Sequence, residues 1–235
     1  FHFIPMSALA GDNVVNPSTN MPWYTGQTLM SLFETVEIAK NRNMQDLRFP
    51  VQYVNRPNLN FRGFCGTLAS GTVRKGDEIV VLPSQKRSRI KSIVTYDEEL
   101  ELAHTEMAVT LTMEDEIDIS RGDMIVHADN YPVVTDSFAA TLVWMTEEAM
   151  LPGKLYDFKF GTKTVSGKVT TLRHRTDVNT LETAPAPTLE LNEIGECEIN
   201  IDQVVCIDSY TSNRSTGAFI IIDRMTNVTI AAGMV

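Results

Sequence analysis

The chain has 235 residues, 43% of them hydrophobic, which is enough for one large folded core or two small ones. Its 30 acidic and 20 basic residues give a net charge of -10, which repels nucleic-acid backbones and anionic lipid surfaces at long range. We therefore expect no nucleic-acid partner, and no membrane partner either, because no run approaches the roughly 18 apolar residues of a membrane span.

The number and spacing of the cysteines, together with the first residues of the chain, indicate the cellular compartment. Cys65, Cys197 and Cys206 form an odd and widely scattered set, which favours reduced thiols over a disulfide framework. Residues 1–5 lack the basic flank and the small-residue cleavage site of a signal peptide. We therefore expect a cytoplasmic protein.

The first part of the chain has a helical pattern. Four apolar residues stand at the i, i+3, i+4 and i+7 spacing that lines one face of a helix: Leu29, Leu32, Phe33 and Val36. The pattern predicts one amphipathic helix over residues 28–38, after a turn-rich stretch. A single helix cannot bury its own apolar face, so we expect it either to pack on later parts of the chain or to complete a domain upstream.

From Leu47 onward, short runs rich in Val, Ile, Thr, Phe and Tyr are broken by turn residues about every ten positions, as in antiparallel β-barrels and sandwiches. A break at residues 129–132 separates two series of predicted strands. The first series covers residues 48–54, 62–69, 78–82, 89–96, 107–113 and 124–127. The second covers residues 137–145, 154–160, 168–175, 188–191, 195–207, 217–223 and 227–231.

Closed barrels account for both series best, because closure removes the exposed edges of an open sheet. We predict a mainly β fold of two consecutive antiparallel β-barrels, preceded by a short helical segment. The expected domains are residues 1–45, 46–135 and 136–235.

Several segments carry a family resemblance. Residues 66–79, which read Gly-Thr-Leu-Ala-Ser-Gly-Thr-Val-Arg-Lys-Gly-Asp-Glu-Ile, resemble the second-domain barrel of translation-factor GTPases. With the more restrictive residues 51–58, 112–123, 191–195 and 213–234, the chain resembles the large, GTPase subunit of bacterial sulfate adenylyltransferase (ATP sulfurylase) over essentially its whole length. The resemblance implies barrels of the elongation-factor-Tu domain II and domain III type, after the C-terminal end of a P-loop GTPase domain.

The resemblance also implies a function. In that family the large subunit hydrolyses GTP and pairs with a small catalytic subunit. The pair forms adenosine 5'-phosphosulfate and pyrophosphate from ATP and sulfate in sulfate assimilation and cysteine biosynthesis, and GTP hydrolysis drives the uphill step. The implied partners are the small catalytic subunit and the chain's own upstream GTPase domain, and the implied cofactors of the intact subunit are GTP and Mg. For this chain alone, interpreted as the back portion of a larger protein, we expect neither cofactor nor activity.

The phosphate-binding loop of a GTPase, Gly-x4-Gly-Lys-Ser/Thr, does not occur in the sequence. The nearest spacing, Gly66 to Gly71, is followed by Thr72 instead of the lysine that neutralises phosphate charge. The Asp-x-x-Gly and Asn-Lys-x-Asp motifs familiar from this superfamily are absent as well. Phosphate and magnesium chemistry is therefore not expected from these residues.

One nucleotide-binding element is matched, by Ser7, Ala8 and Leu9. In relatives, the backbone N–H groups of this element lie against the guanine base, so the resemblance implies a cofactor-binding remnant at these three residues. A serine before an apolar residue is also a common turn or helix cap, and that interpretation stays open.

No catalytic or metal-binding residue is expected. The four histidines lie far apart, and none has a Cys or His at ligand spacing or forms the close pair that would serve adenylyl transfer. The acidic run at residues 114–118 is interpreted as a solvated strand end.

Two pairs of arginines are predicted to make contacts through their charged side chains. Arg56 and Arg62 flank a turn and are predicted to contact another protein. Arg173 and Arg175 are predicted to share a strand face opposite His174 and to pair with surface acids.

Two other functions remain open. A translation-factor relative would have the same fold and would bind tRNA or the ribosome, against which the net charge of -10 argues. A stand-alone β-barrel binding module would have no phosphate-binding loop upstream of Phe1.

Overall fold

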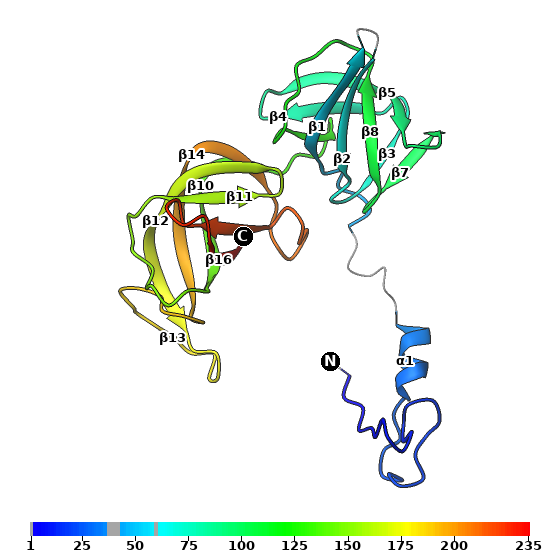
Figure 1. The fold of residues 1–235 in the computed structure, drawn as a ribbon, viewed down its shortest axis with the longest axis vertical. Coiled ribbons are helices and arrows are strands. Elements are labelled where there is room, and N and C mark those ends of the chain that lie inside the picture. The colour runs from blue at the N-terminus through cyan, green and yellow to red at the C-terminus, as the bar shows by residue number, and fades with distance from the viewer. Residues whose placement is uncertain (1, 37–42, 59–60) are drawn as a thin grey trace. The chain divides into compact units, whose positions relative to one another are not determined.

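A computed structural model describes residues 2–36, 43–58 and 61–235. The chain divides into two compact units, residues 1–42 and 43–235. The first holds the helix α1, and the second holds the β-strands (Figure 1). Among the described residues, no helix has the length and apolar character needed to cross a membrane.

The helix α1 (Leu29–Thr35) lies within the predicted range 28–38, of which residues 37 and 38 fall outside the described part of the chain. Thr28 caps its N-terminus, because the side-chain oxygen accepts a hydrogen bond from the backbone nitrogen of Ser31 at 3.3 Å. The position of the predicted helix is confirmed.

The first barrel closes through six antiparallel strands in the order β4-β9-β1-β2-β8-β5 and back to β4 (Figure 1). Alternation along β1 and β4 buries Phe49, Val51, Ile79 and Val81 in its core. Its strands are β1 (Phe49–Asn58), β2 (Phe61–Thr67), β4 (Glu78–Leu82), β5 (Lys86–Val94), β8 (Ala108–Met113) and β9 (Met124–His127), with β6 (Glu99–Leu100) added to β5 and β3 (Thr72–Arg74) paired with β7 (Leu102–His104).

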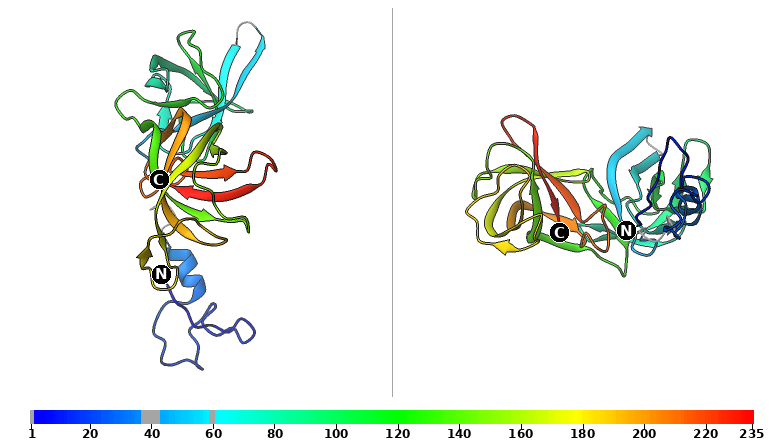
Figure 2. Two further views of the ribbon diagram at one scale, coloured as in Figure 1. Left: turned by 90° about the vertical axis from the view of Figure 1, so that its left-hand side faces the viewer. Right: turned by 90° about the horizontal axis from the view of Figure 1, so that it is seen from below.

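The second barrel closes in the order β11-β15-β16-β10-β14-β12 and back to β11, and both barrels can be followed from two further sides in Figure 2. Aromatic rings fill part of its core: the ring centroid of Phe219 lies 5.0 Å from that of Phe160 and 5.7 Å from that of Phe138. Its strands are β10 (Val133–Trp144), β11 (Tyr156–Phe160), β12 (Lys163–Thr176), β14 (Ile194–Ile207), β15 (Ala218–Ile222) and β16 (Thr229–Met234), with β13 (Thr183–Ala184) added to β12.

The prediction of two consecutive closed antiparallel barrels is confirmed. The predicted strand at residues 188–191 is wrong. Leu189 is buried in the core, but its carbonyl accepts a hydrogen bond from the backbone nitrogen of Met150, in the loop after β10. The alternation of apolar and polar residues at 188–191 arises because the Leu189 side chain is buried, and these residues do not form a β-strand. The strands β3, β6, β7 and β13 were not predicted, because two or three residues are too few to show alternation.

Candidate functional site

Ser7, Ala8 and Leu9 form a tight turn in the first unit. The backbone nitrogen of Ser7 donates to the carbonyl of Asp12 at 3.2 Å, and the Ser7 hydroxyl accepts from the backbone nitrogen of Ala10 at 3.3 Å. Within residues 2–36, the N–H groups of Ala8 and Leu9 make no hydrogen bond, and the Leu9 side chain is fully exposed. The turn therefore presents two free donors and an apolar side chain, while Ser7 acts as the local cap that the alternative interpretation expected.

Two residues that sequence reasoning did not single out hold this turn. Asp12 accepts hydrogen bonds from the Ser18 hydroxyl at 2.6 Å and from the Asn20 amide at 3.1 Å. Asn13 is buried, and its side chain donates to the Pro5 carbonyl at 2.8 Å and accepts from the Ser18 backbone nitrogen at 2.8 Å. The Gly-Asp-Asn sequence at residues 11–13 was the available signal, since such residues form side-chain-stabilised turns.

A buried arginine joins the two barrels in the second unit. Arg48, just before β1, is 2% exposed, and its Nε and Nη2 donate to the two carboxylate oxygens of Asp208 at 2.9 and 3.0 Å. Nη1 donates to the carbonyls of Leu47 and Asn130, at 2.9 and 3.1 Å, and Nη2 also donates to the Asn130 side chain at 3.2 Å. All five guanidinium donors are therefore satisfied, as burial of this charge requires.

A second set of polar contacts lies beside Arg48. The Asn213 amide, from the second barrel, donates to the Ser70 hydroxyl at 2.7 Å, and that hydroxyl donates to the Asp46 carbonyl at 2.6 Å. The Asp46 carboxylate accepts hydrogen bonds from the side chains of Asn43 and Asn130, which lower its pKa. We call these residues, together with Arg48 and Asp208, the barrel junction.

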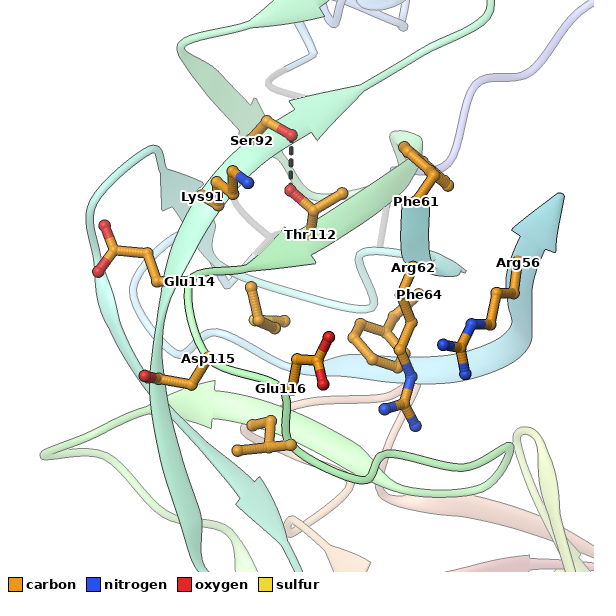
Figure 3. A pocket seen from close by; sticks show the side chains of 12 residues that line it. Arg56, Phe61, Arg62, Phe64, Lys91, Ser92, Thr112, Glu114, Asp115 and Glu116 are labelled. Atoms are coloured by element: carbon orange, nitrogen blue, oxygen red, sulfur yellow. Dashed lines mark hydrogen bonds between the residues drawn. The ribbon is translucent and has the colours of Figure 1, made fainter. Parts of the chain in front are cut away.

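A recess of about 320 Å³ opens on the first barrel, between the β1–β2 hairpin, β5 and the segment after β8 (Figure 3). The predicted pair Arg56 and Arg62 both line it. The structure thus brings these two arginines together at one concave surface, along with acidic side chains from residues 114–116.

Arg173 and Arg175 pair with glutamates in or next to β14, as predicted. The predicted separation of His174 onto the opposite face is wrong, because the β12–β14 register shifts between Leu172 and His174. At this irregularity, both Arg173 and His174 reach Glu196.

Burial makes two of the three thiols, Cys197 and Cys206, unreactive. Burial raises the pKa of Cys197 to about 12 and that of Cys206 to about 11, which keeps both thiols protonated near neutral pH. Across the described ranges, His, Cys, Asp and Glu side chains do not gather in any group of three or more that could hold a metal ion.

Comparison with known proteins identifies relatives of the whole chain. It is 60% identical over 234 residues to the bifunctional enzyme CysN/CysC of Rhodopirellula baltica, covering 100% of this chain and 36% of that protein. It is 59% identical to sulfate adenylyltransferase subunit 1 of Saccharophagus degradans, covering 100% of this chain and 50% of that protein. The chain is a homologue of sulfate adenylyltransferase subunit 1. It therefore spans about half the length of the subunit 1 relative, and the family resemblance found in the sequence is confirmed.

Other comparisons relate this subunit 1 homologue to translation factors. Residues 137–235 match the family model described as GTP-eEF1A C-terminal domain-like. The structure of Sup35 complexed with GDP superposes with a TM-score of 0.76 at 19% identity, over 98% of this chain and 57% of that chain. Elongation factor SelB from Methanococcus maripaludis gives a TM-score of 0.68 at 18% identity, over 88% and 44%. At these identities, the two structures show a shared fold and not a shared ligand.

Proposed function

We propose that the chain is the C-terminal half of the GTPase subunit of a sulfate adenylyltransferase. In the complete enzyme, a nucleotidyltransferase, this subunit would couple GTP hydrolysis to the formation of adenosine 5'-phosphosulfate and pyrophosphate from ATP and sulfate. The observation that carries the proposal is the identity of 59% to sulfate adenylyltransferase subunit 1 over the whole chain, in a protein about twice as long.

The proposed division of labour places the chemistry outside this chain. GTP and Mg would be held by an upstream GTPase domain, because the sequence has no phosphate-binding loop. Ser7, Ala8 and Leu9 would contribute a contact to the guanine base, and the free N–H groups of Ala8 and Leu9 fit a ring edge that carries hydrogen-bond acceptors. The barrels would dock on that domain and on the small catalytic subunit, and so transmit the nucleotide state.

The exposed face of α1 supports an upstream partner domain. Met30 is 41% exposed, Phe33 62% and Val36 47%, and no residue of α1 is buried. Apolar side chains at helical spacing usually cover a core. We propose that residues 1–45 complete a GTPase domain, that residues 46–135 and 136–235 are its two barrel domains, and that the protein works in the cytoplasm.

Reconstitution tests this proposal. The complete subunit that contains this chain would be mixed with the small catalytic subunit, and pyrophosphate release from ATP and sulfate would be followed with and without GTP. We expect one-to-one assembly and GTP-dependent release. A complete, GTP-binding subunit that neither assembles nor supports release would contradict the proposal, and salt-dependent tRNA binding by that subunit would favour a translation-factor function instead.

A further inference from the structure

The recess on the first barrel leaves positive charge unpaired. Arg56 and Arg62 stand next to the paired residues Asn55 and Gly63 of the β1–β2 ladder, just before its register shifts, and Figure 3 shows both guanidinium groups on the same side of the recess. Among the described residues, Arg56 and Lys91 have no ion-pair partner. Within the described ranges, the only ion-pair partner of Arg62 is the exposed Asp118, at 3.4 Å, and Asp118 also pairs with Lys86. Like charges held side by side favour an added anion.

The opposite side of the recess carries negative charge. Figure 3 shows the arginine side chains entering from one side, the Phe64 ring beside Arg62, and Glu116 pointing toward them from the other side. The Arg62 guanidinium lies 5.6 Å from the centroid of Phe64, which holds it over an apolar surface. Asp115 accepts a hydrogen bond from the Ser88 hydroxyl at 2.9 Å, and Figure 3 shows Glu114 pointing away from the arginines. Of the three acids that line the recess, Glu116 is therefore the one placed to meet a ligand beside the arginines.

An occupant that matches this arrangement has a carboxylate for the arginines and a cation for Glu116. A guanidinium pair binds a carboxylate through several N–H donors with defined geometry. A long polyanion fits less well, because the chain has a net charge of -10 and the recess has an acidic rim. The complementary ligand is therefore a protein segment of mixed charge.

We propose that this recess docks an extended segment of the small catalytic subunit, with an acidic side chain held by Arg56 and Arg62 and a basic side chain held by Glu116. This inference rests on the proposed function, which supplies the partner. The site gives the subunits a charge-matched contact on the first barrel, separate from any contact through the GTPase domain.

The test compares variants of the complete subunit that contains this chain, titrated with the small catalytic subunit by calorimetry. We expect Arg56→Glu with Arg62→Glu to raise Kd at least about tenfold, and Glu116→Lys to raise it as well. Lys159→Glu with Lys168→Glu makes the same change in net charge at exposed positions of the second barrel and should leave Kd within about twofold. Should the glutamate pair disturb folding, Arg56→Gln with Arg62→Gln removes both charges without introducing opposite ones and should still weaken binding.

The outcomes separate this inference from the proposed function. If the unaltered subunit binds and the arginine variants bind equally well, the docking site is wrong and the function stands. If the unaltered subunit does not bind at all, the proposed function fails first. Loss of binding to sulfate, phosphate or a labelled RNA in the arginine variants, with the protein complex unchanged, would overturn the inference in favour of a small oxyanion or a nucleic acid.

Discussion

Gly217 occupies a position where the backbone leaves no room for a side chain. Its N–H donates to the Asn213 carbonyl at 2.8 Å, its carbonyl accepts from Val235 at 2.9 Å, and an added Cβ would lie 2.5 Å from the backbone of Tyr210. We expect Gly217→Val to lower the free energy of unfolding by about 3 kcal/mol, because the backbone of the second barrel must shift. Urea unfolding measures the change.

Ser215→Val is the matched control for this substitution. Ser215 lies in the same loop with an exposed side chain, so the same branched group adds little crowding there. We expect a change below about 1 kcal/mol. Equal stability of the Gly217 variant and the unaltered protein would show that the close approach to Tyr210 relaxes at no cost.

The thiol of Cys197 offers a second test at single-residue scale. With its pKa raised to about 12 by burial, only about one molecule in ten thousand carries the thiolate at pH 8. We expect Cys197 to resist alkylation by iodoacetamide in the native protein and to react fully in denaturant, as read by mass spectrometry. Native alkylation as fast as that in denaturant would show that the barrel opens around this residue.

At the scale of one element, Asp223 organises the turn between β15 and β16. Its carboxylate accepts hydrogen bonds from the backbone nitrogens of Thr226 and Met225, both at 3.0 Å, and pairs with Lys154 at 3.2 Å. Bonds from Thr226 and from Lys154 lower its pKa from 3.8 to about 2. A lowered carboxyl pKa stabilises the folded state above about pH 4, and this contribution is lost as the pH falls toward 2.

Asp223→Asn tests the charge of this residue apart from its hydrogen bonds. The substitution removes the negative charge, while the amide oxygen still accepts the hydrogen bonds from the backbone of the turn. We expect the variant to be less stable than the unaltered protein at pH 7 and the difference to shrink between pH 4 and pH 2. Urea midpoints at several pH values measure this. A difference that stays constant down to pH 2 would mean that the charge of Asp223 does not favour folding.

The hydrophobic alternation of the sequence predicts long strands but not the irregularities and contacts that depend on a partner strand. The long strands were predicted because alternation persists over many residues, as in β14 with 14 residues. The shift between Leu172 and His174 could not be predicted, because a bulge depends on the partner strand. The role of Arg48 at the barrel junction could not be predicted either, because its partners Asn130 and Asp208 lie 82 and 160 positions away in the sequence. The sequence predicted only that Arg48 begins a strand.

The candidate sites were predictable to different degrees. Ser7, Ala8 and Leu9 came from the family resemblance, and no property of those residues alone distinguishes a nucleotide contact from a turn. Arg56 and Arg62 could be singled out by charge beside a turn. Lys91 and Glu116 join them in the recess only through the closure of the barrel, which brings β5 and the segment after β8 beside the β1–β2 hairpin.

At the scale of the whole molecule, nucleotide binding should require more than this chain. Only one of the guanine-nucleotide motifs is matched, and the phosphate-binding loop is absent from the sequence. We therefore expect no saturable GTP binding at micromolar concentration by this chain alone, measured by calorimetry, although the barrels fold. Micromolar binding would show that residues outside the familiar motifs hold the nucleotide.

The barrel junction decides whether the two barrels unfold as one body. Arg48→Met leaves the Asp208 carboxylate largely buried with the Thr216 hydroxyl as its remaining bonded side chain, which should cost about 3 kcal/mol. Because the lost contacts join the barrels, we expect the single calorimetric transition of the unaltered protein to divide into two. Adding Asp208→Leu removes the unpaired charge and should recover part of the lost stability while the transitions stay separate. A single transition at the original temperature in Arg48→Met would show that other contacts hold the barrels together.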